Sequence, residues 1–167
     1  MDIQKKIFIK KIKDYKICVF GDLMLDNYIS GHCENISPEA PVPVVEVVDE
    51  FSRLGGAGNV VSNIANLGAN VVPVGLIGTD KNGVLLKTLL SDFSSSMDYV
   101  MALEPICTTT KTRIIANGQQ VVRYDKEQTN INNDVEDALI NCLDKVIDDV
   151  DLIIISDYGK NTCSDDL

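Results

Sequence analysis

The sequence has no apolar run long enough to span a membrane and no surplus of basic charge. Its 167 residues include 15 Lys and Arg against 25 Asp and Glu, which gives a net charge of −10. Binding to nucleic acid or to an anionic membrane needs a basic surface that neutralises phosphate groups, so this balance disfavours both. A small anionic ligand held by a few local Lys and Arg side chains remains compatible with it.

Histidine and paired cysteines are also scarce. The one histidine, His32, lies between Gly31 and Cys33, so serine or cysteine hydrolase chemistry would lack its usual base. The five cysteines are an odd number and no two have C-x-x-C spacing, which favours neither a disulfide framework nor a zinc site. We therefore expect reduced thiols, as in a cytoplasmic protein, and no metal site.

Two further motifs are missing. Residues 1–15 are rich in Lys but have no continuous apolar segment and no small-residue cleavage site, so we expect a leader helix or extension rather than a secretory signal. The chain also contains no Gly-x-x-x-x-Gly-Lys-Ser/Thr run, which excludes a P-loop phosphate site.

The most informative stretch that is present is Gly55-Gly56-Ala57-Gly58-Asn59. It follows a strand-like run and opens the segment 60–67, which has helical apolar spacing. Unpaired N–H groups and the helix dipole at such a position favour polar or anionic oxygens. The amide of Asn59 can both donate and accept hydrogen bonds. Taken alone, the stretch is either a ligand-binding loop or a tight turn.

Strands and helices alternate along most of the chain. Apolar runs predict strands at 17–20, 71–77, 99–102 and 152–155, and apolar periodicity predicts helices at 58–67, 83–90 and 135–146. This alternation predicts an α/β domain over 16–167 with mainly parallel core strands. A strand at 44–48 and a hairpin at 108–124, turning at Asn117-Gly118, do not fit the alternation and predict a small second sheet.

Polar residues follow three of the predicted core strands. Ligands in open α/β sheets bind at the carboxyl ends of strands, and these ends carry Gly21-Asp22, Gly78-Thr79-Asp80 and Ser156-Asp157-Tyr158. Carboxylates there suit sugar hydroxyls, because each accepts several hydrogen bonds. The alternative for each Asp is a helix cap or a turn, and for Asp80 we expect the cap.

The hairpin carries three cations. Lys111 and Arg113 alternate along one predicted strand and therefore share a face, and Arg123 lies on the other strand. Such cations can hold a phosphate, which Arg binds in bidentate fashion. The alternative is a solvated strand face.

Six strings, which together span about Lys16 to Lys160, carry a resemblance to a known family. They are VFGDLMLDNYISG (19–31), ISPEAPVPVVEV (36–47), LGGAGNVVSNIANLGA (54–69), GLIGTDKNG (75–83), TTTKTRIIANGQQVVRYD (108–125) and IISDYGK (154–160). With them the chain resembles the N-terminal half of a ribokinase-type (PfkB-type) carbohydrate kinase. Through the second and fifth strings it resembles most closely the heptose-7-phosphate kinases.

The resemblance implies a doubly wound, mainly parallel α/β core, incomplete because only the N-terminal half is present, and a small β-lid. The lid strands, at about 24–48 and 106–125, would close over the sugar and form a homodimer contact. The implied reaction is ATP-dependent phosphorylation of the anomeric hydroxyl of D-manno-heptose 7-phosphate, on the way to ADP-heptose and lipopolysaccharide. The alternatives are a ribokinase-type kinase for another sugar, or a non-catalytic module that binds a sugar phosphate or dimerises.

The resemblance also assigns roles by position. Asp22 and Asp26 would bind sugar hydroxyls, and Gly55, Gly56 and Asn59 would form the sugar loop. Lid residues near the substrate and its phosphate would be Lys111, Arg113, Gln120 and Arg123, while Asp157 and Lys160 would face the active centre. The catalytic base, the anion hole and the adenine pocket are expected beyond Leu167. By this reading ATP and Mg²⁺ serve the complete enzyme, and this half alone binds neither.

Overall fold

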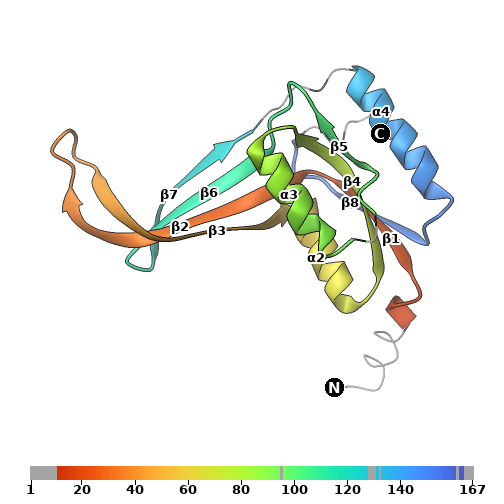
Figure 1. Cartoon of the computed structure of the whole chain (residues 1–167), viewed down its shortest axis with the longest axis horizontal. Coiled ribbons are helices and arrows are strands. Elements are labelled where there is room, and N and C mark those ends of the chain that lie inside the picture. Colours follow the sequence, from red (N-terminus) through yellow and green to blue (C-terminus); the bar gives the residue numbers. More distant parts are fainter. Residues whose placement is uncertain (1–10, 95, 128–130, 132, 161, 164–167) are drawn as a thin grey trace.

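The computed structural model describes residues 11–94, 96–127, 131, 133–160 and 162–163. Figure 1 shows a core of strands and helices from which a long, narrow sheet projects to one side. The greater part of the predicted leader, residues 1–10, lies outside the described residues.

The core sheet has four parallel strands in the order β5-β4-β1-β8. Their bounds are Lys16–Gly21 for β1, Asn70–Gly78 for β4, Val100–Leu103 for β5 and Leu152–Ser156 for β8. Side chains alternate between the faces, so Ile17 and Val19 join one buried cluster while Cys18 and Phe20 join another. The prediction of a mainly parallel α/β core is confirmed.

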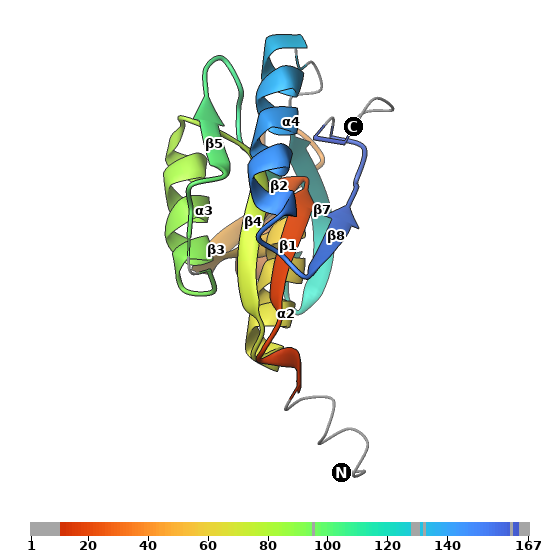
Figure 2. The same ribbon diagram turned by 90° about the vertical axis from the view of Figure 1, so that its right-hand side faces the viewer.

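Helices cover both faces of the core sheet, as a doubly wound fold requires. Helices α2 (Ala57–Leu67) and α3 (Lys81–Ser91) pack on one face, and α4 (Asn133–Ile147) packs on the other (Figure 2). Helix α2 ends at Gly68, whose φ of 102° is left-handed. Helix α3 begins at Asp80, whose side chain accepts a hydrogen bond from Gly83 N at 2.9 Å, so the expected cap is confirmed.

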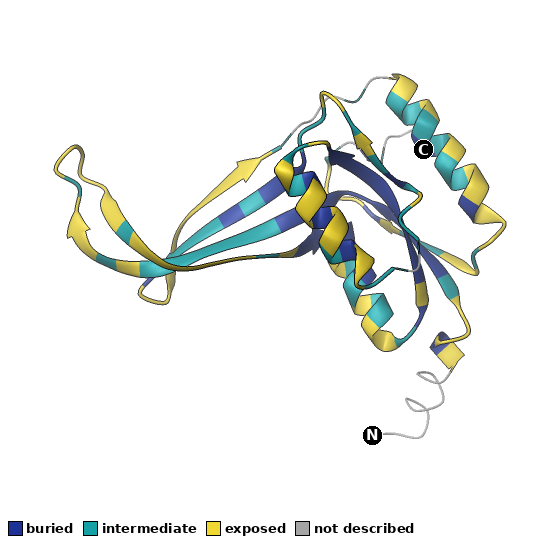
Figure 3. Cartoon of the chain, in the orientation of Figure 1, coloured by how far each residue is buried: buried dark blue, intermediate teal, exposed yellow. Residues whose placement is uncertain are grey.

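The second sheet, which we call the lid, has the strand order β3-β2-β6-β7. Its strands are β2 (Leu23–Ile36), β3 (Pro43–Gly56), β6 (Thr109–Ala116) and β7 (Gln119–Lys126). Strands β6 and β7 form the predicted hairpin, and Asn117 and Gly118 have the positive φ angles, 51° and 79°, that a tight two-residue turn needs. Figure 3 shows that β2 and β3 are exposed toward the far end of the lid and buried where they join the core, whereas β7 is exposed over its whole length.

Strand β3 is much longer than predicted. The sequence indicated a strand at 44–48, because the polar run Asp49-Glu50 interrupts the apolar pattern. Backbone pairing with β2 nevertheless carries β3 on to Gly56. Gly55 and Gly56 are therefore the last residues of a strand rather than a loop, and α2 begins directly after them.

Strand β8 is an edge of the core sheet, because among the described residues it pairs with β1 alone. Leu152 and Ile155 on this strand are 52% and 67% exposed. No helix in the described part of the chain is long and apolar enough to cross a membrane.

Candidate functional site

The two sheets meet where the chain leaves the core and where it returns. Asp22 is the single residue between β1 and β2, and Gly56 ends β3 next to it. Ala57 N, at the start of α2, donates to the carbonyl oxygen of Asp22 at 2.9 Å. A Cβ atom on Gly56 would lie 2.4 Å from that oxygen, and Gly56 has a φ of 52°, so this crossing requires glycine.

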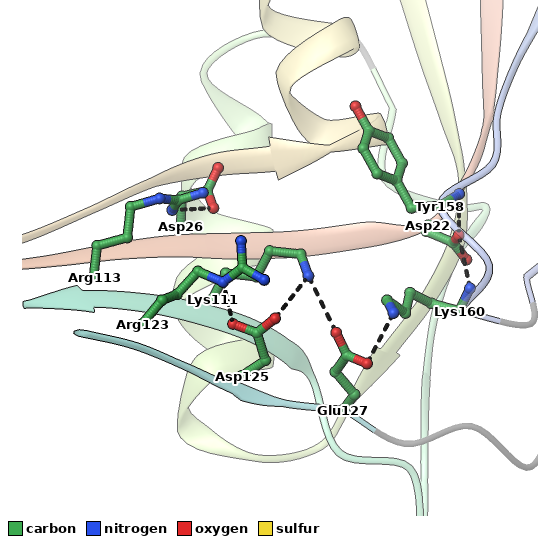
Figure 4. A network of polar contacts seen from close by, with 9 residues as sticks. All are labelled: Asp22, Asp26, Lys111, Arg113, Arg123, Asp125, Glu127, Tyr158 and Lys160. Carbon is green, nitrogen blue, oxygen red and sulfur yellow. Dashed lines mark hydrogen bonds and ion pairs between the residues drawn. The ribbon is translucent and has the colours of Figure 1, made fainter. Parts of the chain in front are cut away.

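The Asp22 side chain is buried, with 1% of its surface exposed, and its carboxylate holds the loop after β8. Oδ2 accepts hydrogen bonds from Tyr158 N at 2.7 Å and Lys160 N at 3.1 Å (Figure 4). Oδ1 accepts one from Thr162 N at 3.1 Å. A carboxylate offers about four acceptor positions, so about one is left. The adjoining cavity of about 20 Å³ has room for about one water molecule. The contact between Asp22 and a sugar hydroxyl stays a prediction.

Asp26 lies on the lid beside the glycine pair. Its Oδ1 accepts a hydrogen bond from an Arg113 terminal nitrogen at 2.6 Å, and both side chains are 22% exposed. This bond raises the pKa of Arg113 further above its usual value. A Cβ atom on Gly55 would lie 2.8 Å from Asp26 Oδ2, so the absence of a side chain at Gly55 leaves room for the carboxylate. The structure thus joins three predicted site residues: Asp26, Gly55 and Arg113.

A second group of charges joins the lid to the loop after β8. Lys111 Nζ lies 3.2 Å from Asp125 Oδ2 and 3.1 Å from Glu127 Oε1. The other oxygen of Glu127 lies 2.8 Å from Lys160 Nζ, and Asp125 Oδ1 lies 3.0 Å from Arg123 Nε (Figure 4). These five residues form one continuous ion-pair network, with side chains 15–23% exposed except Arg123, which is 50% exposed.

Sequence reasoning identified the cations of this network but missed Asp125 and Glu127. The missing signal was alternation, because residues 123, 125 and 127 share one face of an extended strand. The register places Asp125 directly opposite Lys111, as an ion pair across two antiparallel strands requires. Opposite charges at these positions could therefore have been anticipated once the hairpin turn was placed.

The network shifts the pKa values of its members. The hydrogen bond from Lys160 lowers the pKa of Glu127, partial burial opposes this, and Lys111 lowers the pKa further. Burial would raise the pKa of Asp125, but the hydrogen bond and charge of Lys111, together with Arg123, outweigh it and the pKa is lowered. For Lys111, burial acts to lower the pKa, and Glu127 and Asp125 together raise it.

Arg53 and two aromatic residues extend this lid face. Tyr28 and Phe51 stack with ring centroids 4.9 Å apart and an interplanar angle of 12°. The Arg53 guanidinium lies 5.0 Å from the Phe51 ring centroid, and that of Arg113 lies 5.3 Å from the Tyr28 centroid. Sequence reasoning singled out none of Tyr28, Phe51 and Arg53. Their contacts need the register between β2 and β3, which places Tyr28 opposite Phe51 and Asp26 opposite Arg53.

Three predicted site residues lie apart from these contacts. Asn59 is exposed on α2, makes none of these contacts, and lines a groove of about 260 Å³ that shares Arg53 with the lid face and also involves Phe93. Gln120 is exposed at the hairpin turn end of β7, and Asp157 is exposed with its Oδ1 accepting a hydrogen bond from Gly159 N at 2.7 Å. Their predicted substrate contacts stay predictions.

Solved structures of similar shape include a carbohydrate kinase and a ribokinase. A carbohydrate kinase from Agrobacterium tumefaciens superposes with a TM-score of 0.62 at 18% identity, covering 84% of this chain and 45% of that one. Arabidopsis thaliana ribokinase, solved with ribose and ATP, gives 0.59 at 16% identity over 84% of this chain and 45% of its own. At this identity the likeness establishes the ribokinase-like fold.

Sequence comparison gives closer relatives. Bifunctional protein HldE from Helicobacter hepaticus is 47% identical over 156 residues, and that from Sulfurimonas denitrificans is 44% identical over 153 residues. These matches cover 93% and 91% of this chain but 32% of each relative, so the chain spans about a third of their length. The profile of the pfkB family carbohydrate kinases matches residues 14–163. The chain therefore belongs to the pfkB family of carbohydrate kinases.

Proposed function

We propose that the chain forms the sugar-phosphate-binding part of a kinase that phosphorylates the anomeric hydroxyl of D-manno-heptose 7-phosphate. The proposal rests on one observation above all: Asp26, a hydroxyl acceptor, lies on the same lid face as the Lys111 ion-pair network. A sugar phosphate needs both kinds of partner at once. The relatives named HldE and the strings at 36–47 and 108–125 support heptose as the sugar.

ATP would be the phosphoryl donor with Mg²⁺, as phosphoryl transfer in kinases requires a metal that bridges the phosphates. The described residues include no group of three His, Cys, Asp or Glu side chains that could hold a metal ion. The residues of this chain would bind and orient the sugar phosphate, and the setting would be cytoplasmic.

Titration calorimetry on the chain tests this proposal with three ligands: heptose 7-phosphate, unphosphorylated heptose and fructose 6-phosphate. We expect heptose 7-phosphate to bind most tightly. Asp26→Asn should weaken the binding of heptose 7-phosphate by about 1.5–3 kcal/mol, the scale of a hydrogen bond to a charged group. Asp49→Asn, on the exposed lid strand β3, is the matched control and should change little. Equal binding of all three ligands would contradict the proposal.

We also propose that the lid mediates a homodimer. Its edge strands β3 and β7 expose large apolar side chains: Val44, Val47, Val48, Phe51, Val121, Val122 and Tyr124. Burying such side chains against a second lid would remove apolar surface from water. Val48→Lys should shift sedimentation toward the monomer, whereas Val84→Lys, at a 65% exposed position on α3, should not. Monomeric wild-type protein at micromolar concentration would contradict the lid dimer.

A further inference from the structure

Glu127 bridges two lysines that come from different parts of the fold. Lys111 belongs to lid strand β6, and Lys160 lies in the loop after core strand β8. One Glu127 oxygen contacts Lys111 Nζ at 3.1 Å, and the other contacts Lys160 Nζ at 2.8 Å. A single carboxylate thus occupies the space between two ammonium groups, in the way an anionic ligand would.

Both lysines have anchors other than Glu127. The backbone N–H of Lys160 donates to the buried Asp22 carboxylate at 3.1 Å. Lys111 is paired in the strand ladder opposite Asp125, whose carboxylate lies 3.2 Å from Lys111 Nζ. When the Glu127 side chain moves away, Lys111 Nζ therefore keeps a carboxylate partner, and the backbone of Lys160 stays fixed beside it.

Glu127 is the more exchangeable of the two carboxylates. Asp125 is fixed within the β6–β7 ladder and also contacts Arg123. Glu127 follows Lys126, the last residue of β7, so its backbone lies outside the ladder, and its side chain is longer and has more rotatable bonds than that of Asp125. Both carboxylates are 23% exposed, so a ligand can reach Glu127, and position and side-chain length distinguish it from Asp125.

The charges of the network match a phosphate once Glu127 leaves. Lys111, Arg123 and Lys160 carry three positive charges, and Asp125 and Glu127 carry two negative ones. With Glu127 displaced, the remaining four residues carry a net charge of about +2. A phosphate monoester carries about −1.5 to −2 at neutral pH and has three strong acceptor oxygens.

We propose that Glu127 occupies the position of a ligand phosphate between Lys111 and Lys160, and that phosphate binding displaces it. Glu127 is then a specificity-determining residue, since a ligand must bring a dianionic group to compete with a tethered carboxylate. The inference rests on the proposed binding of a sugar phosphate. The phosphate could belong to the sugar or to the nucleotide, so the shared chemistry is a phosphate dianion.

The test compares Glu127→Gln with the wild-type chain, using inorganic phosphate as the probe and NMR chemical shifts as the readout. The neutral amide keeps the size of the side chain but competes less for the lysines. We expect phosphate to bind about fivefold more tightly, the scale of one or two part-buried ion pairs. Glu46→Gln, which removes one charge from an exposed site on β3, should leave phosphate affinity unchanged.

A double variant guards against an indirect effect. Glu127→Gln combined with Lys160→Met leaves one ammonium group at the position, so the gain in phosphate affinity should vanish. Unchanged or weaker phosphate binding by Glu127→Gln would overturn the inference, because Glu127 would then be a permanent ion-pair partner of the two lysines that phosphate does not displace.

Two further ligands separate this inference from the proposed function. If Glu127→Gln binds heptose 7-phosphate more tightly than the wild type does but binds ATP equally well, the phosphate belongs to the sugar. The reverse result assigns it to the nucleotide. If inorganic phosphate binds more tightly to the variant, but heptose 7-phosphate binds no more tightly than inorganic phosphate, the displacement of Glu127 is supported and the assignment of heptose as the sugar fails. If heptose 7-phosphate binds the wild type, and Glu127→Gln binds neither heptose 7-phosphate nor inorganic phosphate more tightly, the assignment of heptose is supported and the displacement of Glu127 fails.

Discussion

Replacing Asp22 by Asn tests whether this residue organises the junction between core and lid. The buried carboxylate accepts three backbone hydrogen bonds from Tyr158, Lys160 and Thr162. Asn has the same shape but one acceptor oxygen and one NH₂ group. The oxygen can keep the two bonds made by Oδ2, and the NH₂ group then faces Thr162 N–H, donor against donor.

The expected cost follows from that count of bonds. One hydrogen bond to a carboxylate is lost, and a buried N–H is left without an acceptor, which costs about 1–3 kcal/mol. The two remaining bonds lose their charge assistance. We expect Asp22→Asn to lower the free energy of unfolding by about 2–4 kcal/mol. Asp157→Asn makes the same chemical change at an exposed site with one turn hydrogen bond and should cost less than about 1 kcal/mol.

Urea unfolding followed by circular dichroism measures both free energies, and hydrogen exchange shows where protection is lost. We expect hydrogen exchange to accelerate most at Tyr158, Lys160 and Thr162, whose backbone N–H groups donate hydrogen bonds to Asp22. If Asp22→Asn costs no more than Asp157→Asn, the three bonds do not hold the loop and the reasoning fails.

Three further predictions concern the lid. Because Lys111 lowers the pKa values of Asp125 and Glu127, Lys111→Met should raise both toward their ordinary values of 3.8 and 4.5 in carboxyl NMR titrations. A carboxylate whose pKa is lowered by folding stabilises the fold at pH values above its ordinary pKa. The difference in stability between Lys111→Met and wild type should therefore shrink as pH falls below about 4. Gly55→Ala places a Cβ 2.8 Å from Asp26 Oδ2 and should weaken heptose binding in calorimetry by about 1 kcal/mol or more, with unchanged binding refuting the contact. Arg123→Ala should weaken the binding of heptose 7-phosphate but not of unphosphorylated heptose. Arg113→Ala removes the partner of Asp26 and should weaken the binding of both sugars, so the same pattern of losses in the two variants would refute this division of roles.

The sequence predicted elements better than partners. Apolar periodicity and turn signals located the core strands, the helices and the Asn117-Gly118 hairpin, because those features depend on neighbours along the chain. The extension of β3 to Gly56 depends on backbone pairing with β2. Such pairing does not require apolar residues at Asp49 and Glu50, so the sequence pattern does not indicate it. The three backbone bonds to Asp22 come from residues 136 to 140 positions away, so no local pattern could indicate them.

The paired state of the lid cations changes how phosphate recognition must work. Counting Lys111, Arg113 and Arg123 in the sequence suggests free positive charge, yet each one contacts a carboxylate. A ligand phosphate therefore gains only the difference between its own contacts and the ion pairs that it replaces. That difference is small for a singly charged ligand, which at best matches the carboxylate that it displaces, and larger for a dianion. A face built from paired charges thus gains selectivity for phosphate at the expense of affinity, while the carboxylates keep its cations from being buried without partners.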